Sequence, residues 1–299
     1  MKKIGLAAAV LFAMTGAHAY QFEVQGQSEY LNTTANDKNY TGDLQGTYYF
    51  KNVDASKGPL AEAAFLNKAS NVSVGYSYEQ YSQKNSVNYH IGTYGVKGET
   101  YFTTPYTASI PLYASASYNH TDVDSKNNFA RDDKGDRYAL EVGAMPTNNF
   151  LVAVGYSNVA NQFSLDTFRI LNKGFVNAVG ETASISDKQD VVTARTKYVG
   201  AIDGTNMSLG FDAGIVFGQA TSYEFNTDLY LTPKLSVGAS FAGTSESEAV
   251  FDKIWGANVN YFITPAVSVG ATYTNANSSH TTGNNFDTQT IGLNAKARF

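Results

Sequence analysis

The end of the chain alternates between apolar and polar residues in steps of two. Apolar residues stand at Ile291, Leu293, Ala295, Ala297 and Phe299, and the positions between them are Thr290, Gly292, Asn294, Lys296 and Arg298. Successive side chains of a β-strand point to opposite faces, so this pattern predicts a strand with one apolar and one polar face. Lipid requires an apolar outer face and a wet lumen permits a polar inner one, which favours the wall of a membrane β-barrel.

The same alternation recurs along the chain and predicts about 14 strands, most of them near the ~9–11 residues that a tilted transmembrane strand needs. The expected segments are 21–30, 40–50, 72–78, 94–102, 110–118, 138–144, 150–156, 192–198, 207–217, 223–231, 235–241, 255–263, 267–273 and 291–299. The predicted fold is therefore an all-β, transmembrane antiparallel β-barrel. An even strand number would leave both ends of the barrel chain in the periplasm.

The first residues predict export. Lys2 and Lys3 precede a short apolar run, and Ala17-His18-Ala19 has the pattern of a cleavage site. The run is shorter than the ~20 residues that span a bilayer, so we interpret residues 1–19 as a signal peptide and residues 20–299 as the barrel. The expected location is the bacterial outer membrane.

Composition narrows the class further. The chain has no cysteine, which excludes disulfides and thiol chemistry. Its net charge is −5, and loss of the first segment removes two lysines and no acid, so nucleic acid is not an expected partner. The mean hydropathy is −0.26 despite 21 Tyr and 18 Phe. A helical membrane protein would be far more apolar, whereas only half of each barrel strand faces lipid.

The connections are predicted to be short turns on the periplasmic side and longer loops on the extracellular side, with two exceptions. Residues 59–67 read as a short periplasmic helix with proline at its first position. This helix either caps the barrel base or narrows its exit. The loop 158–189 is longer than a passive hairpin loop and carries apolar anchors at Phe163, Phe168, Ile170 and Phe175. It either folds over or into the mouth, or extends a strand above the membrane.

The polar faces of the strands supply candidate pore-lining residues, in which acids slightly outnumber bases. These candidates are Glu23, Asp43, Lys97, Glu99, Arg137, Glu141, Arg195, Lys197, Asp212, Glu224 and Asp228. Opposed charges across a lumen of this size would create a transverse field and a selectivity filter. The same charges could instead pair with one another and hydrate the wall.

Catalysis is not expected. No Gly-x-Ser-x-Gly motif is present, and the histidines left after cleavage, His90, His120 and His280, fall near outer strand ends. No cofactor and no metal site are expected. Strand one begins directly after the signal, which leaves no room for the plug domain of a gated receptor. The remaining alternatives are a diffusion channel and a largely closed barrel that acts as a surface adhesin or host-interaction protein.

Three segments carry a family resemblance: residues 20–30, the run Gly58-Pro59-Leu60-Ala61-Glu62-Ala63-Ala64-Phe65-Leu66, and residues 93–99. With them the chain resembles the putative-porin family of Gram-negative outer membranes, and within it the small carbapenem-associated porins. The resemblance implies a monomeric 14-stranded barrel that passes water and small solutes and acts as a virulence factor toward host surfaces. Expected partners are outer-membrane lipid, lipopolysaccharide, water and small solutes, and the barrel-assembly machinery acting on the strand that ends at Phe299.

Overall fold

The protein is a closed barrel of fourteen antiparallel strands in the part of the chain that the structure, a computed structural model, describes. The described residues are 19–33, 39–82, 88–107, 109–125, 133–159, 189–218, 221–245, 253–277 and 287–299. Each strand pairs with its sequence neighbours, and β1 pairs with β14 to close the ring. The strands are β1 (Ala19–Thr33), β2 (Asn39–Asp54), β3 (Asn71–Ser82), β4 (Asn88–Phe102), β5 (Leu112–Ser125), β6 (Asp133–Thr147), β7 (Phe150–Val159), β8 (Gln189–Ala201), β9 (Ser208–Phe217), β10 (Thr221–Thr232), β11 (Leu235–Thr244), β12 (Lys253–Thr264), β13 (Val267–Asn277) and β14 (Asp287–Arg298).

Apolar and polar side chains alternate between the outer and inner faces of the barrel wall, as the sequence pattern predicts. On β2, Leu44 is 56% exposed, whereas Asp43 and Gln45 on either side of it are buried. On β14, Ile291 and Leu293 are exposed and Thr290 is buried. The exposed apolar side chains therefore form the outer surface, and the polar ones turn inward, as a membrane barrel requires.

The seam between the two ends of the chain is continuous. Val24 lies opposite Ala297 and Ser28 opposite Leu293 in the β1–β14 register. The carbonyl of Phe299 accepts hydrogen bonds from the backbone N–H groups of Gln21 and Phe22, at 2.8 and 3.1 Å. A ring closed in this way has no free sheet edge, so the backbone polar groups of the wall are satisfied without water.

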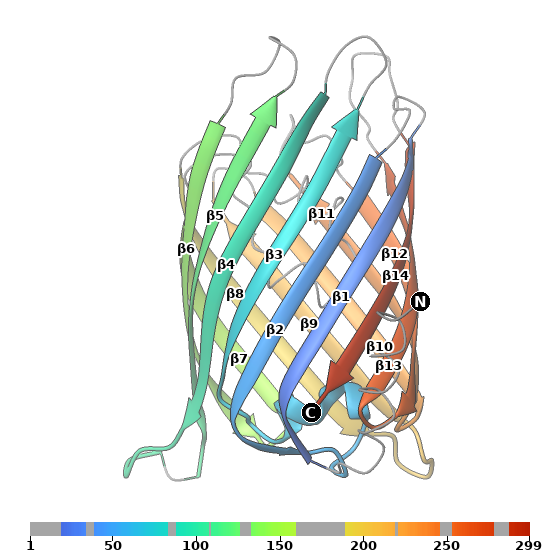
Figure 1. Ribbon diagram of the computed structural model, residues 1–299. Coiled ribbons are helices and arrows are strands. Elements are labelled where there is room, and N and C mark those ends of the chain that lie inside the picture. The colour runs from blue at the N-terminus through green and yellow to red at the C-terminus, as the bar shows by residue number, and fades with distance from the viewer. Residues whose placement is uncertain are drawn as a thin grey trace.

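A short helical segment lies inside the base of the barrel, beside the C-terminus (Figure 1). It consists of the 3₁₀ turn η1 (Leu60–Glu62) and the helix α2 (Ala63–Leu66), within the range where the sequence indicates a helix. The connection from β2 to β3 that carries it, residues 55–70, is called the floor below. Among the described residues, no helix is long and apolar enough to cross a membrane.

The prediction of fourteen strands is confirmed, but several strands are longer than expected. β1, β4 and β6 each have 15 residues and β2 has 16, against the ~9–11 needed to cross the hydrocarbon. The expected strand 110–118 begins at Leu112, because Pro111 cannot donate to the ladder. The anchors Phe163, Phe168, Ile170 and Phe175, and nearly all of the segment 158–189, lie outside the described residues.

Candidate functional site

Local backbone chemistry shapes the floor. Gly58 has a φ of +127°, and a Cβ there would lie 2.9 Å from Leu66 Cδ1, so the turn into the helix requires glycine. Pro59 follows as the N-cap residue of η1. At the other end, the Asn67 side chain donates to the carbonyls of Ala63 and Asp54, at 2.7 and 2.8 Å. These contacts fold a short segment that would not be helical in isolation.

Apolar side chains of the floor reach three parts of the barrel wall. Phe65 belongs to a buried cluster with Tyr113, Met145, Leu151, Ala153, Val199 and Tyr230, which come from β5, β6, β7, β8 and β10. Ala63 packs in a second cluster with Tyr20, Tyr49, Val53 and Ala69. Leu60 packs with Ala55 and Phe262 of β12. The floor therefore crosses the base from one side of the barrel to the other.

Hydrogen bonds and an ion pair also hold the floor against the barrel wall. The Glu62 carboxylate lies 2.7 Å from Lys197 Nζ and accepts a 2.8 Å hydrogen bond from the Tyr230 hydroxyl. The Leu60 N–H donates to the carbonyl of Pro233, and the Leu60 carbonyl accepts from Arg298 Nη1, both at 2.8 Å. Each end of η1 is thus tied to a different part of the barrel.

Two lysines of the floor, Lys57 and Lys68, lie near Lys51 at the end of β2. Lys51 and Lys57 are exposed, and Lys68 has a φ of +49°, which is unusual for a residue other than glycine. Partial burial lowers the pKa of the Lys68 ammonium from its ordinary value, and the like charges of Lys51 and Lys57 lower it further. This part of the floor therefore combines a left-handed backbone with like charges near one another.

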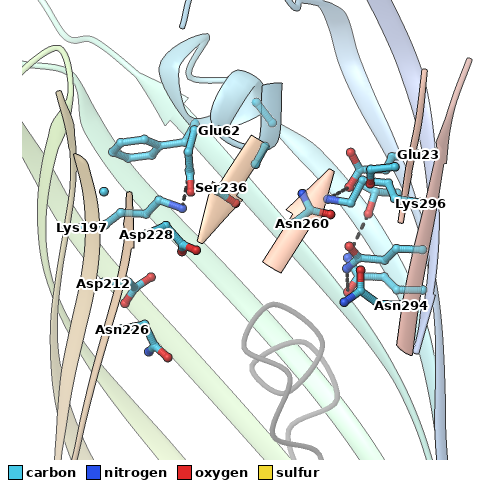
Figure 2. A pocket seen from close by; sticks show the side chains of 18 of the residues that line it. Glu23, Glu62, Lys197, Asp212, Asn226, Asp228, Ser236, Asn260, Asn294 and Lys296 are labelled. Carbon is cyan, nitrogen blue, oxygen red and sulfur yellow. Dashed lines mark hydrogen bonds and ion pairs between the residues drawn. The ribbon is translucent and has the colours of Figure 1, made fainter. Parts of the chain in front are cut away.

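Above the floor lies a cavity of about 340 Å³ inside the barrel, called the chamber below. Its walls come from opposite sides of the ring, and its lining is largely polar. Figure 2 shows Glu62 reaching from the floor to Lys197, with Asp228, Asp212 and Asn226 along that wall. Glu23, Lys296 and Asn294 face them from the other side.

The charged groups of the wall form ion pairs along it. Arg195 makes a two-pronged contact with Glu141, at 2.7 and 3.2 Å, and lies 3.6 Å from Asp212. Lys97 pairs with Glu99 at 2.9 Å on the same strand. These contacts are of the second kind that the sequence allowed, in which the charges pair with one another along the wall. Their partners sit side by side on the wall.

A second ion-paired cluster lies at the seam. Glu23 accepts from Arg298 Nε at 2.7 Å and lies 3.1 Å from Lys296 Nζ. The Arg298 guanidinium also lies over the rings of Tyr20 and Phe262, at 4.6 and 4.7 Å from their centroids. Arg298 is 2% exposed, so its charge is enclosed by one carboxylate, two ring faces and a floor carbonyl.

The candidate pore-lining residues do not all lie in one place. Seven of them line the chamber: Glu23, Lys97, Glu99, Arg195, Lys197, Asp212 and Asp228. Glu141 supports Arg195 from the wall without lining the chamber. Asp43, Arg137 and Glu224 are buried elsewhere on the strands. Sequence reasoning separated inward from outward positions, but it carried no information on height within the barrel.

Two kinds of chamber residue were missed by the sequence reasoning. Glu62 was seen only as part of a helix, although its place opposite the apolar positions of that helix could have marked it as polar and inward. The neutral amides of the lining, such as Gln25, Gln45, Asn226 and Asn258, were passed over in favour of charged residues. Within the described residues, no group of three or more His, Asp or Glu side chains is placed to hold a metal ion.

Comparison with known proteins gives a family. Residues 1–299 match the model of the family described as "Putative general bacterial porin". The chain is 51% identical to the Acinetobacter baumannii outer membrane protein Omp33, with 95% of this chain and 100% of that one covered and a TM-score of 0.68. No curated protein matches the chain.

More distant structures share the barrel alone. The CymD monoaromatic hydrocarbon channel is 7% identical, with 98% of this chain and 91% of that one covered and a TM-score of 0.57. The Ralstonia pickettii toluene transporter TbuX is 8% identical, with 95% and 90% covered and a TM-score of 0.52. At such low sequence identities, structural similarity shows a shared fold and nothing about function.

Proposed function

Because the chain belongs to the general bacterial porin family and is a barrel of the bacterial outer membrane, we propose that it is a passive channel for water and small polar solutes. The observation that carries the proposal is the polar chamber inside a wall whose outer face is apolar. Solutes would cross by diffusion, with size exclusion and electrostatics as the only selection. No cofactor, energy source or catalytic step enters the mechanism.

The narrowest part of the path is proposed to lie at the floor. Its helical segment contacts β5, β7, β8 and β10 on one side and β12 on another, so it occupies the space through which a solute would leave the base. With an even strand number, the floor would face the periplasm and the loop 158–189 the outside. That loop, with help from residues 122–136, is proposed to narrow the outer end. Residues 1–19 are proposed as the signal peptide.

Single-channel recording of the refolded chain from residue 20 tests this function. Discrete conductance steps in planar bilayers, together with swelling of proteoliposomes in small neutral solutes, are expected. A heat-modifiable, folded barrel that gives neither steps nor swelling would contradict the proposal.

The packing of the floor also favours a second candidate, a barrel closed at rest whose role is contact with host surfaces. The apolar clusters on both sides of the floor are the observation in its favour. It predicts no permeation from folded protein, but binding of the intact barrel to host cells that is lost when the extracellular loops are shortened. In either case the proposed molecule is a monomer, surrounded by outer-membrane lipid and lipopolysaccharide and inserted through its last strand.

A further inference from the structure

The charged lining of the chamber is balanced among the residues that the structure describes. It contains five carboxylates and five cations. The carboxylates are Glu23, Glu62, Glu99, Asp212 and Asp228. Glu141, just outside the lining, adds one more negative charge through its contact with Arg195. A lumen that selects by the sign of charge would show a clear excess of one sign, and this chamber does not.

Every one of the five cations already has a carboxylate within 3.6 Å. Lys97 lies 2.9 Å from Glu99, and Arg195 lies 2.7 Å from Glu141 and 3.6 Å from Asp212. These pairs are tightened by neutral donors, since Glu99 also accepts from Asn71 at 3.1 Å and from Tyr113 at 2.9 Å. An arriving anion would have to compete with carboxylates that are already in contact.

The remaining cations are compensated in the same way. Lys197 lies 2.7 Å from Glu62, and Lys296 and Arg298 share Glu23 at 3.1 and 2.7 Å. The side chains of Lys197 and Lys296 are only 23% and 21% exposed, so their pairs are partly shielded from water. At such burial the field of a compensated pair falls off as a dipole, and little of it reaches the centre of the chamber.

Neutral hydrogen-bonding groups fill the space between the ion pairs. Gln25 donates to Gln45 at 3.3 Å, Gln45 donates to Thr47 at 3.0 Å, and Thr47 lies 2.9 Å from Ser73. On the opposite side, Asn258 donates to Asp228 at 3.0 Å. Amides and hydroxyls present donors and acceptors together, which suits a solute that carries both.

We infer that the chamber selects small uncharged solutes rich in hydroxyl or amide groups, such as monosaccharides and polyols, over ions of either sign. This inference rests on the proposed channel function. An anion that leaves water here loses hydration and meets only cations that already contact a carboxylate, and such a transfer is costly. A cation meets carboxylates that are held in ion pairs or, at Asp228, hydrogen-bonded to the Asn258 amide. A polyol exchanges its water hydrogen bonds for those of the wall at little net cost. The volume of about 340 Å³ is at the lower end of small-molecule sites, roughly 300–1,000 Å³.

The test compares three solutes with one carbon skeleton: glucose, gluconate and glucosamine, which are neutral, anionic and cationic. Uptake of each labelled compound into proteoliposomes is measured with the membrane potential clamped at zero. Glucose is expected to be taken up at least about tenfold faster than either ion, a difference of ~1.4 kcal/mol in barrier. Gluconate or glucosamine uptake equal to that of glucose would overturn the inference and leave the channel function standing. Uptake of none of the three by folded protein would overturn both.

Two substitutions that shift the charge balance of the chamber in opposite directions provide an independent test. Glu23→Gln leaves Lys296 and Arg298 without their shared carboxylate, so gluconate uptake is expected to rise relative to glucose. Arg195→Gln removes the Arg195 charge from its contacts with Glu141 and Asp212, so glucosamine uptake is expected to rise. A general loosening of the barrel would raise the uptake of both gluconate and glucosamine in both variants. That result, or no change in either ratio, would contradict selection by charge compensation.

Discussion

The Glu62→Gln substitution tests whether the floor is held by its polar contacts. The Glu62 carboxylate is 15% exposed, lies 2.7 Å from Lys197 and accepts from Tyr230 at 2.8 Å. Glutamine keeps the size of the side chain and an acceptor for Tyr230, but it removes the charge. A hydrogen bond to a charged group contributes roughly 1.5–3 kcal/mol, so a loss of about 2 kcal/mol is expected, or about 30-fold in the opening of the floor.

Hydrogen–deuterium exchange reads this opening directly. The amides of Asn67, Lys68 and Ala69 donate to carbonyls within the floor at 2.9–3.0 Å, so they exchange when the floor unfolds locally. Their exchange is expected to accelerate about 30-fold in Glu62→Gln, as the equilibrium shift requires, while the strands stay protected. Solute uptake is expected to rise in the same variant, because an undocked floor no longer fills the base.

Glu141→Gln is the matched control. It removes the same charge from a pair of the same length, 2.7 Å, but Glu141 contacts Arg195 on the wall and not the floor. Exchange of the floor amides is expected to stay at the wild-type rate in this variant. The reasoning would be refuted if Glu62→Gln left the floor amides unchanged in a folded barrel, or if Glu141→Gln accelerated them equally.

Further substitutions test other parts of the argument. Gly58→Ala is expected to destabilise the floor by about 1–3 kcal/mol, because alanine is strained at a φ of +127°, with faster exchange at 67–69 as the readout. Lys68→Gly is expected to slow the same exchange, since glycine adopts a φ of +49° without strain; faster exchange would show that the lysine side chain holds the floor. Leu293→Arg is expected to lower barrel stability by roughly 2–4 kcal/mol in lipid, as measured by urea titration in vesicles. Deletion of residues 163–179 is expected to raise conductance, and an unchanged conductance would mean that this loop is not the outer constriction.

The strands of the wall could be predicted from the sequence because the same alternation of apolar and polar residues recurs in each of the fourteen strands. The alternation of Leu44 with Asp43 and Gln45 reports which face meets lipid, and no knowledge of distant residues is needed to interpret it. The same rule separated the inward charges from the outward apolar residues. It could not say which of them share a chamber, since height in the barrel depends on strand tilt and register, which a single strand does not record.

The contacts of the floor lay beyond sequence reasoning for a related reason. Glu62 and Lys197 are far apart in the chain, and nothing near either residue marks the other as its partner. The pairing follows only once the barrel has closed and the helix has entered it. The pairing of charges along the wall, one of the two arrangements left open by the sequence, depends on register in the same way, because Arg195 meets Glu141 through adjacent registers of β6, β7 and β8.

Arg298 has a consequence for the order in which the molecule can be built. It stands one residue from the end of the chain, yet it bonds Glu23 of the first strand and the Leu60 carbonyl of the floor. The floor therefore lacks one of its ties until the last strand has joined the first. Pairing of the last strand with the first therefore finishes the wall and completes the anchoring of the floor in one event.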